Sequence, residues 1–159
     1  MYQYRDAEHA DFNEIAKMPR NREELFYVFP SGTFPIAPEQ LEQAAATRFS
    51  PTVITDRDEI VGYCNLYGVT AGQDGWLGNV IVHPGRRRSG IGEFLLRAMM
   101  QRASAEHGCR ELKLVCHNTN TRALLFYYKQ GFRPFDMKMM NDHEGKPIAG
   151  IMLSLSLVE

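Results

Sequence analysis

The sequence has little cysteine, and its cysteines form no recognisable framework. Cys64, Cys109 and Cys116 are an odd set of three among 159 residues, with no pair in CxxC spacing. Such a set argues against a disulfide scaffold and against a zinc site. We therefore expect a protein of a reducing compartment with no bound metal.

Long hydrophobic runs are missing as well. The N-terminal segment MYQYRDAEHADF carries charges where a signal peptide needs an apolar stretch, and no apolar run approaches the roughly 18 residues of a membrane span. No repeat, low-complexity tract or linker divides the sequence. It predicts a single cytoplasmic domain over residues 1–159, without membrane association.

Neither sign of charge is in excess. Eighteen Lys and Arg against nineteen Asp and Glu give a formal net charge of -1. No global field therefore draws the protein to nucleic acid or to an anionic membrane, and any anion site must be local. With 44% hydrophobic residues, the chain has enough apolar side chains for a core without disulfide or metal support.

Hydrophobic periodicity predicts a mixture of helices and strands. Helices are expected over residues 7–17, 39–48, 89–108 and 121–130, and strands over residues 2–5, 52–55, 60–69, 76–82, 112–116, 132–140 and 148–157. The strands on either side of the long helix must pair in parallel, because a crossover connection joins them. The prediction is an α/β (α+β) fold with a mixed, mostly antiparallel central sheet of about seven strands and helices on both faces.

The densest chemical signal is the segment from Val80 to Glu93, VIVHPGRRRSGIGE. An apolar strand leads into a short basic turn, and a helix follows. Gly90 and Gly92 allow a ligand to approach the backbone closely, and the start of the helix offers unpaired N–H groups and the positive end of its dipole. The segment therefore suits a bound phosphate. The alternative is that the arginines are only solvated and the glycines only permit a sharp turn.

Two common phosphate motifs do not fit this segment. A P-loop needs Gly-Lys-Ser/Thr, but Gly92 is followed by Glu93, and a dinucleotide motif needs a third glycine where Leu95 stands. The pattern that does fit is Arg-x-x-Gly-x-Gly, with Arg87, Gly90 and Gly92. The expected ligand is neither a nucleoside triphosphate with magnesium nor a dinucleotide.

A second segment carries a further pattern, Asn-x-x-Ala followed by Tyr-x-x-x-Gly-Phe, at Asn120, Ala123, Tyr127, Gly131 and Phe132. Together the two segments resemble the GNAT N-acetyltransferase superfamily, and the resemblance covers nearly the whole chain from Pro51 onward. It implies acetyl-CoA (coenzyme A) as the cofactor. It also implies that the parallel strands 76–82 and 112–116 splay apart, so that the pantetheine arm can lie between them.

The resemblance also implies the cofactor contacts. The main chain of Val80, Ile81 and Val82 is expected to pair with the pantetheine amides, with an N–H near Val80 holding the acetyl oxygen as charge develops on it. Asn120 is expected to bond the pantetheine or to cap its helix, two roles that are compatible, and Ala123 is also expected to bind the cofactor. The remaining cofactor-binding residues are expected in the loop and the first turn of the helix: Arg87, Arg88, Ser89, Gly90, Ile91, Gly92 and Glu93.

Tyr127 is the candidate catalytic acid, because a phenol close to the cofactor sulfur can protonate the departing thiolate. The alternative is that Tyr127 and Tyr128 both pack as ordinary helix residues. The general base is left open, because Trp76 stands where some family members carry a glutamate. His117, at the end of strand 112–116, is the candidate; a purely structural histidine, or a mechanism without a base, are the alternatives.

The aromatic segment between the first two predicted helices is the candidate acceptor site. As a lid it would form an apolar wall with carboxylates near its base, which suits a cationic amine on a hydrophobic frame. The alternative is that these aromatic residues only fill the core. The expected substrate-binding residues are Glu24, Phe26, Tyr27, Phe29 and Phe34.

The predicted function is direct, metal-free transfer of an acetyl group from acetyl-CoA to a small-molecule or peptide amine. The alternative is a catalytically silent acyl-CoA-binding sensor. Nucleic-acid binding through Arg86, Arg87 and Arg88 is disfavoured, because the cluster is short and no stacking motif flanks it. Strand edges within residues 132–157 leave a homodimer open.

Overall fold

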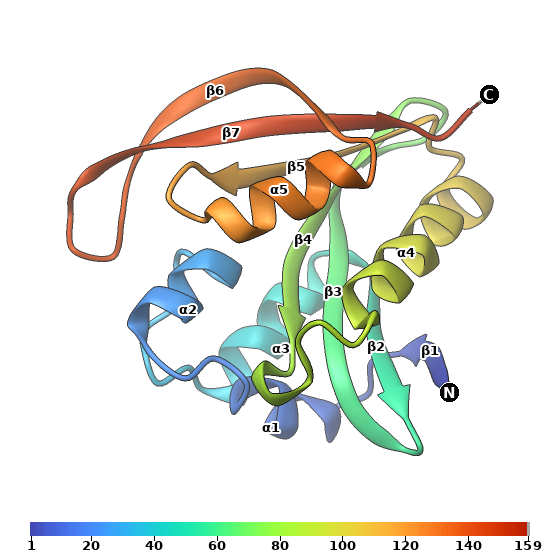
Figure 1. Ribbon diagram of the computed structural model, residues 1–159. Helices are drawn as coiled ribbons and strands as arrows, with labels where there is room; N and C mark the ends of the chain where they lie inside the picture. Colours follow the sequence, from blue (N-terminus) through green and yellow to red (C-terminus); the bar gives the residue numbers. More distant parts are fainter. Residues whose placement is uncertain (159) are drawn as a thin grey trace.

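The computed structural model describes residues 1–158. A seven-stranded sheet lies at its centre, in the order β1-β2-β3-β4-β5-β7-β6 (Figure 1). Within the described chain, β4 and β5 pair in parallel and all other neighbours are antiparallel. The strands are β1 (Tyr2–Asp6), β2 (Phe49–Asp56), β3 (Glu59–Thr70), β4 (Asp74–Val82), β5 (Glu111–His117), β6 (Arg133–Asn141) and β7 (Pro147–Ser156).

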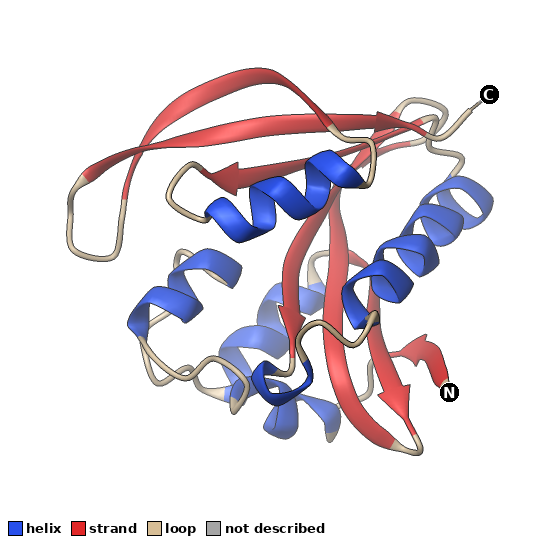
Figure 2. Ribbon diagram, in the orientation of Figure 1, coloured by secondary structure: helices blue, strands red, loops and turns tan. Residues whose placement is uncertain are grey.

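Helices cover both sides of this sheet (Figure 2). One side packs on the first three helices, through a core that includes Phe12, Leu25 and Leu41, and the other side packs on the last two. The helices are α1 (Asp11–Ala16), α2 (Arg22–Val28), α3 (Pro38–Ala46), α4 (Ile91–His107) and α5 (Thr121–Lys129). The mixed, mostly antiparallel sheet with helices on both faces is thus confirmed. None of these helices is long and apolar enough to cross a membrane.

Helix α2 was not predicted from the sequence. It begins after Asn21, whose side-chain oxygen accepts a hydrogen bond from the N–H of Glu24 at 2.8 Å. With seven residues it covers only two turns, and its run Leu-Phe-Tyr-Val shows no helical periodicity. The hydrophobic pattern therefore did not indicate a helix here. The helix is stabilised instead by the packing of its buried residues Leu25 and Phe26.

The parallel strands β4 and β5 pair over three residues only, from Asp74–Glu111 to Trp76–Lys113. A bulge in β4 accompanies their separation. Tyr63 of β3 pairs with Ile81 and Asn65 pairs with Gly78, so that two residues of β4 lie opposite one of β3. A bulge of this kind increases local twist and bends the strand. In Figure 1 the two strands start side by side and run apart.

Helix α4 is the crossover between these two strands. It begins at the left-handed Gly90 (φ 81°) and ends at the left-handed Gly108 (φ 68°). Both positions favour glycine, because other residues have a Cβ that clashes in this conformation. Its buried face, which includes Leu95, Leu96 and Met99, packs against the sheet. The first turn of α4 is thereby fixed at the end of β4.

Arg102 of α4 joins the helix to the first two strands. Its side chain is 9% exposed, and its guanidinium donates to Thr52 Oγ1 at 2.8 Å and to Asp6 Oδ1 at 2.6 Å. A third contact reaches Glu106 at 2.8 Å. A buried guanidinium with several charge-assisted bonds stabilises more than an exposed one.

We expect Arg102→Met to lower the free energy of unfolding by about 1–3 kcal/mol, because Thr52 loses a buried partner and two charge-assisted bonds disappear. The matched control is Arg97→Met in the same helix, whose side chain is 76% exposed and which should change the stability by less than about 0.5 kcal/mol. Urea unfolding of the two variants measures the difference. Equal losses would show that the Arg102 contacts contribute nothing specific.

Candidate active site

The loop after β4 is exposed to solvent where it leads into α4. Arg88 (φ 67°) and Gly90 (φ 81°) are both left-handed, and the Tyr2 hydroxyl donates to the Ser89 carbonyl at 2.6 Å, which fixes the loop between them. A Cβ on Gly90 would meet no atom within 4 Å, whereas one on Gly92 would lie 3.3 Å from the Phe126 ring. Gly90 therefore faces open space, and Gly92 makes room for α5.

The three arginines of the loop have different partners. Arg86 donates to Asp56 at 2.9 Å and to Glu59 at 2.8 Å, which ties the loop to the β2–β3 turn. Arg87 reaches Glu24 of α2 at 3.4 Å. Arg88 has no ion pair among the described residues and is exposed. Arg86 thus supports the loop, and its two neighbours are the cations that can turn toward an anion.

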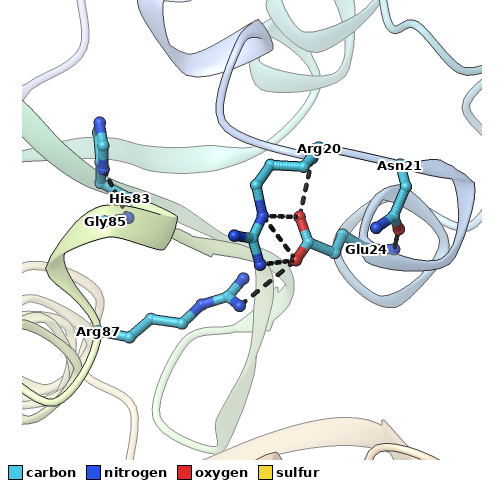
Figure 3. A network of polar contacts seen from close by, with 6 residues as sticks. All are labelled: Arg20, Asn21, Glu24, His83, Gly85 and Arg87. Atoms are coloured by element: carbon cyan, nitrogen blue, oxygen red, sulfur yellow. Dashed lines mark hydrogen bonds and ion pairs between the residues drawn. The ribbon is translucent and has the colours of Figure 1, made fainter.

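The carboxylate of Glu24, on α2, lies between the side chains of Arg20 and Arg87 (Figure 3). Its carboxylate accepts from Arg20 Nη2 at 2.7 Å and from the Arg20 N–H at 2.8 Å, in addition to Arg87. The side-chain hydrogen bond from Arg20 is the main cause that lowers the pKa of Glu24 to about 2. Its charge is shared by two guanidinium groups, so the expectation of a carboxylate free to bind a cationic acceptor does not fit this arrangement.

The aromatic residues expected in the acceptor site separate into three places. Phe29 is buried in the core between α1, α3 and the sheet, so the core-filling alternative holds for it. Phe34 is 37% exposed and lies in the segment before α3. Phe26 and Tyr27 remain near β5: the Phe26 ring lies 4.5 Å from that of His117, and the Tyr27 hydroxyl donates to Thr119 Oγ1 at 3.0 Å.

His117 ends β5 where the strand has separated from β4. The pairing of β5 with β4 ends four residues before it, where Lys113 stands opposite Trp76. The imidazole is buried, and its Nε2 has no hydrogen-bond partner in the described part of the chain. Burial, and then the charge of Lys138, lower the pKa of His117. The side chain is therefore a neutral imidazole with a nitrogen that lacks a partner, beside the separated strand.

Tyr127 is the buried residue of α5, on the opposite side of the sheet from His117. Its ring packs on Phe126 and Phe132, with centroids 5.4 and 5.6 Å away. Burial raises its pKa, so the phenol keeps its proton. Tyr128 points outward, 54% exposed, with Arg133 stacked on its ring at 4.0 Å. The two tyrosines are thus distinct, as the predicted helix register requires.

The other expected cofactor-binding residues lie at the end of β4, at the start of α4 and at the start of α5. Val80 and Val82 are partly buried and Ile81 is buried, and Ile91 packs into the core at the first position of α4. Asn120 is the residue before α5. Within the described residues its side chain makes no capping hydrogen bond, which leaves its amide for a ligand. Ala123 packs against the main core.

A buried polar network beside the β4 bulge was missed in the sequence. Asn79, at the bulge with φ 48°, donates from Nδ2 to the Val28 carbonyl of α2 at 2.8 Å. Its Oδ1 accepts from Asn65 at 3.0 Å and from Arg48 at 2.9 Å. The available signal was two asparagines inside strand runs, since this residue type is depleted in strands.

The His117 environment predicts a pH dependence of stability. Its folded pKa lies below the unfolded value near 6.5, so the unfolded state binds the proton first as pH falls. Stability should therefore be full above about pH 6.5 and decline below it. We expect His117→Gln to flatten this decline, measured by urea unfolding between pH 5 and 8.

The control for this experiment is His9→Gln. Glu42 raises the pKa of the exposed His9, so its contribution has the opposite sign and is lost as pH rises. Removing His9 should leave the decline at acid pH in place. A wild-type slope in His117→Gln would contradict the neutral, buried state of His117.

The sequence and the fold were compared with those of known proteins. A sequence model described as "Acetyltransferase (GNAT) family" matches residues 10–132. The chain is 35% identical over 105 residues to a mycothiol acetyltransferase of Stackebrandtia nassauensis, covering 59% of this chain and 32% of that protein. It is 36% identical over 77 residues to that of Mycolicibacterium smegmatis, covering 48% and 24%. The chain thus matches a third or less of the length of these relatives.

Solved structures share the fold over the full chain. A putative phosphinothricin N-acetyltransferase superposes with a TM-score of 0.81 at 21% identity, covering 100% of both chains. The spermidine N-acetyltransferase of Vibrio cholerae, solved with CoA and spermine, gives 0.82 at 14% identity, covering 98% and 95%. With the family model spanning most of the sequence, these findings show that the chain belongs to the GNAT acetyltransferase family, whose members use acetyl-CoA.

Proposed function

We propose that this protein is an acetyl-CoA-dependent N-acetyltransferase that moves the acetyl group directly to the amine of a small molecule or peptide. The observation that carries the proposal is the split between β4 and β5. The loop that would hold the phosphates lies at one end of it, and His117 lies on its edge with an Nε2 atom that has no partner among residues 1–158. A buried polar atom without a protein partner is rare in a folded domain and is suited to a ligand.

The residues around the split fit coenzyme A. The N–H groups at the start of α4 and the exposed Arg87 and Arg88 would hold its phosphates, over the open face of Gly90. The main chain from Val80 to Val82 would pair with its amides, as an added strand does. When bound, the cofactor supplies an acetyl thioester whose sulfur leaves as a thiol.

The two titratable groups are suited to opposite tasks. His117 is neutral, so its Nε2 can take the proton from an amine bound on the α2 side of the sheet. Tyr127 is protonated, so its hydroxyl can give a proton to the departing sulfur on the α5 side. The N–C bond forms as the C–S bond breaks, and no covalent enzyme intermediate is required.

The direct test follows thiol release from acetyl-CoA with a panel of amines, next to calorimetric titration of acetyl-CoA alone. An N-acetyltransferase releases thiol in proportion to acetylated amine. Binding without thiol release for any amine would instead establish the sensor alternative, in which the Trp76 position lacks a catalytic carboxylate. Failure to bind acetyl-CoA at all would overturn both.

We expect Arg87→Ala to weaken acetyl-CoA binding by about tenfold or more, the usual effect of a lost charge-assisted bond. Glu24→Gln should instead tighten binding, because it frees Arg87 and removes a negative charge from beside the phosphates. Calorimetry at two salt concentrations measures both effects, and the gain in Glu24→Gln should shrink at high salt. Glu23→Gln is the neighbouring control. Weaker binding in Glu24→Gln would mean that Glu24 positions Arg87 for the cofactor rather than competing for it.

Tyr127→Phe is expected to lower kcat by about 10²-fold, within the range of general acid catalysis, with acetyl-CoA affinity unchanged. Tyr128→Phe controls for removal of a hydroxyl from the same helix and should have little effect. Single-turnover kinetics give the chemical step. Full single-turnover transfer by Tyr127→Phe would assign protonation of the sulfur to water.

A further inference from the structure

Arg48 is a partly buried cation without a carboxylate partner. Its Nη1 donates to the amide oxygens of Asn65 at 3.0 Å and Asn79 at 2.9 Å, and its guanidinium lies 4.7 Å from the centre of the Tyr67 ring. No carboxylate of the described residues lies within ion-pair distance of it. By contrast, Arg86 and Arg102 each contact two carboxylates. A cation taken partly out of water is normally paired.

The position of this cation is fixed by the two asparagines. Asn65 Nδ2 donates to the Tyr63 hydroxyl at 3.1 Å and to Asn79 Oδ1 at 3.0 Å, and Asn79 Nδ2 donates to Val28. Because both amide nitrogens are used in this way, both oxygens must point at Arg48. The guanidinium is therefore held in place before any ligand arrives, as a preorganised recognition group requires.

Arg48 lies against the strand that carries the split. A Cβ on Gly78 would be 2.5 Å from Arg48 Nη1, so the guanidinium rests directly on β4, two residues before Val80. Gly78 and Trp76 are on one face of β4, because side chains alternate along a strand. Trp76 pairs with Lys113, and His117 is on the same face of β5 as Lys113. Arg48 and His117 are thus on the same face of the sheet.

The other charges that the strands place on this face are of both signs. Lys113 pairs with Asp74 at 2.8 Å and with Glu111 at 3.3 Å. Asp136 and Lys138 share the face on β6, with one charge of each sign. The uncompensated charge beside β4 is that of Arg48, so the face attracts an anion and disfavours a polycation.

We propose that Arg48 binds a carboxylate of the acceptor, and that the acceptor is therefore an amine that also carries a carboxylate, such as an amino acid or a short peptide. The proposal rests on the acetyl transfer proposed above and adds the class of acceptor. The carboxylate would contact the guanidinium on the side away from the asparagines, with the amine directed to His117. Arg48 would then determine acceptor specificity without taking part in proton transfer.

The test compares matched acceptors on the wild-type protein: leucine with leucinamide, phenylalanine with phenylalaninamide, and a dipeptide with its C-terminal amide. We expect kcat/KM to be about tenfold or more higher for the carboxylate member of the preferred pair, the effect of one charge-assisted contact. The amino acid and dipeptide pairs distinguish the two sources of the carboxylate. An amino acid amide has the less basic amine, so a larger fraction of it is neutral near pH 7, which favours the amide and works against the expected result.

Arg48→Gln should remove this preference. It should lower kcat/KM for the carboxylate form by about tenfold, change that for the amide by less than about threefold, and leave acetyl-CoA affinity unchanged. A parallel loss for both forms would make Arg48 a structural residue and overturn the proposal. If Arg48→Gln does not fold, the wild-type comparison decides.

The wild-type result separates this proposal from the proposed function. Turnover of the amides, or of spermidine, at equal or higher kcat/KM than the carboxylates would overturn the role of Arg48 and leave acetyl transfer intact. Binding of acetyl-CoA with no turnover of any acceptor, polyamines included, would overturn acetyl transfer itself and this proposal with it.

Discussion

The bulge in β4 is the constraint on which the site depends. Two residues of β4 stand opposite one of β3, the strand bends, and its ladder with β5 ends after Trp76. A continuous ladder would use the main-chain groups from Val80 to Val82 within the sheet, and none would remain for a ligand. The strained residue is Asn79, whose left-handed backbone is held by three hydrogen bonds of its side chain. These hydrogen bonds stabilise the bulge near which β4 separates from β5.

Helix α2 connects the bulge to the rest of the site. Its last residue, Val28, accepts from Asn79, while Glu24 accepts from Arg87 of the loop after β4. Tyr27 bonds Thr119 after β5, and Arg22 donates to the His143 carbonyl in the β6–β7 turn at 3.0 Å. One short helix therefore contacts the loop after β4, the bulge of β4, the end of β5 and the β6–β7 turn. A rearrangement of α2 would therefore break or shift its contacts with Asn79, Arg87, Thr119 and His143.

The sequence predicted the elements whose signal is local. Gly90 and the arginine-rich turn identified the start of α4, and the crossover rule identified the parallel pair. It could not predict α2 or the pairing of Glu24 with Arg87, because these depend on contacts between distant segments. The same limit applies to Phe29: an aromatic residue in a proline-marked segment reads equally as a pocket wall or as core, and only packing decides. No pattern in the sequence indicates a role for Arg48, because that role depends on the residues that surround its side chain in the fold.

The arginines show how environment, rather than residue type, separates support from recognition. Arg86 and Arg102 have carboxylate partners, so their charge is used within the fold. Arg87 shares a carboxylate that Arg20 already holds, so it can leave that contact without exposing an unpaired anion. Arg48 has amide oxygens only, which orient a guanidinium but do not neutralise it. A cation that is oriented but not neutralised gains most from an incoming anion, and it lies on the strand where an acceptor would have to meet the thioester.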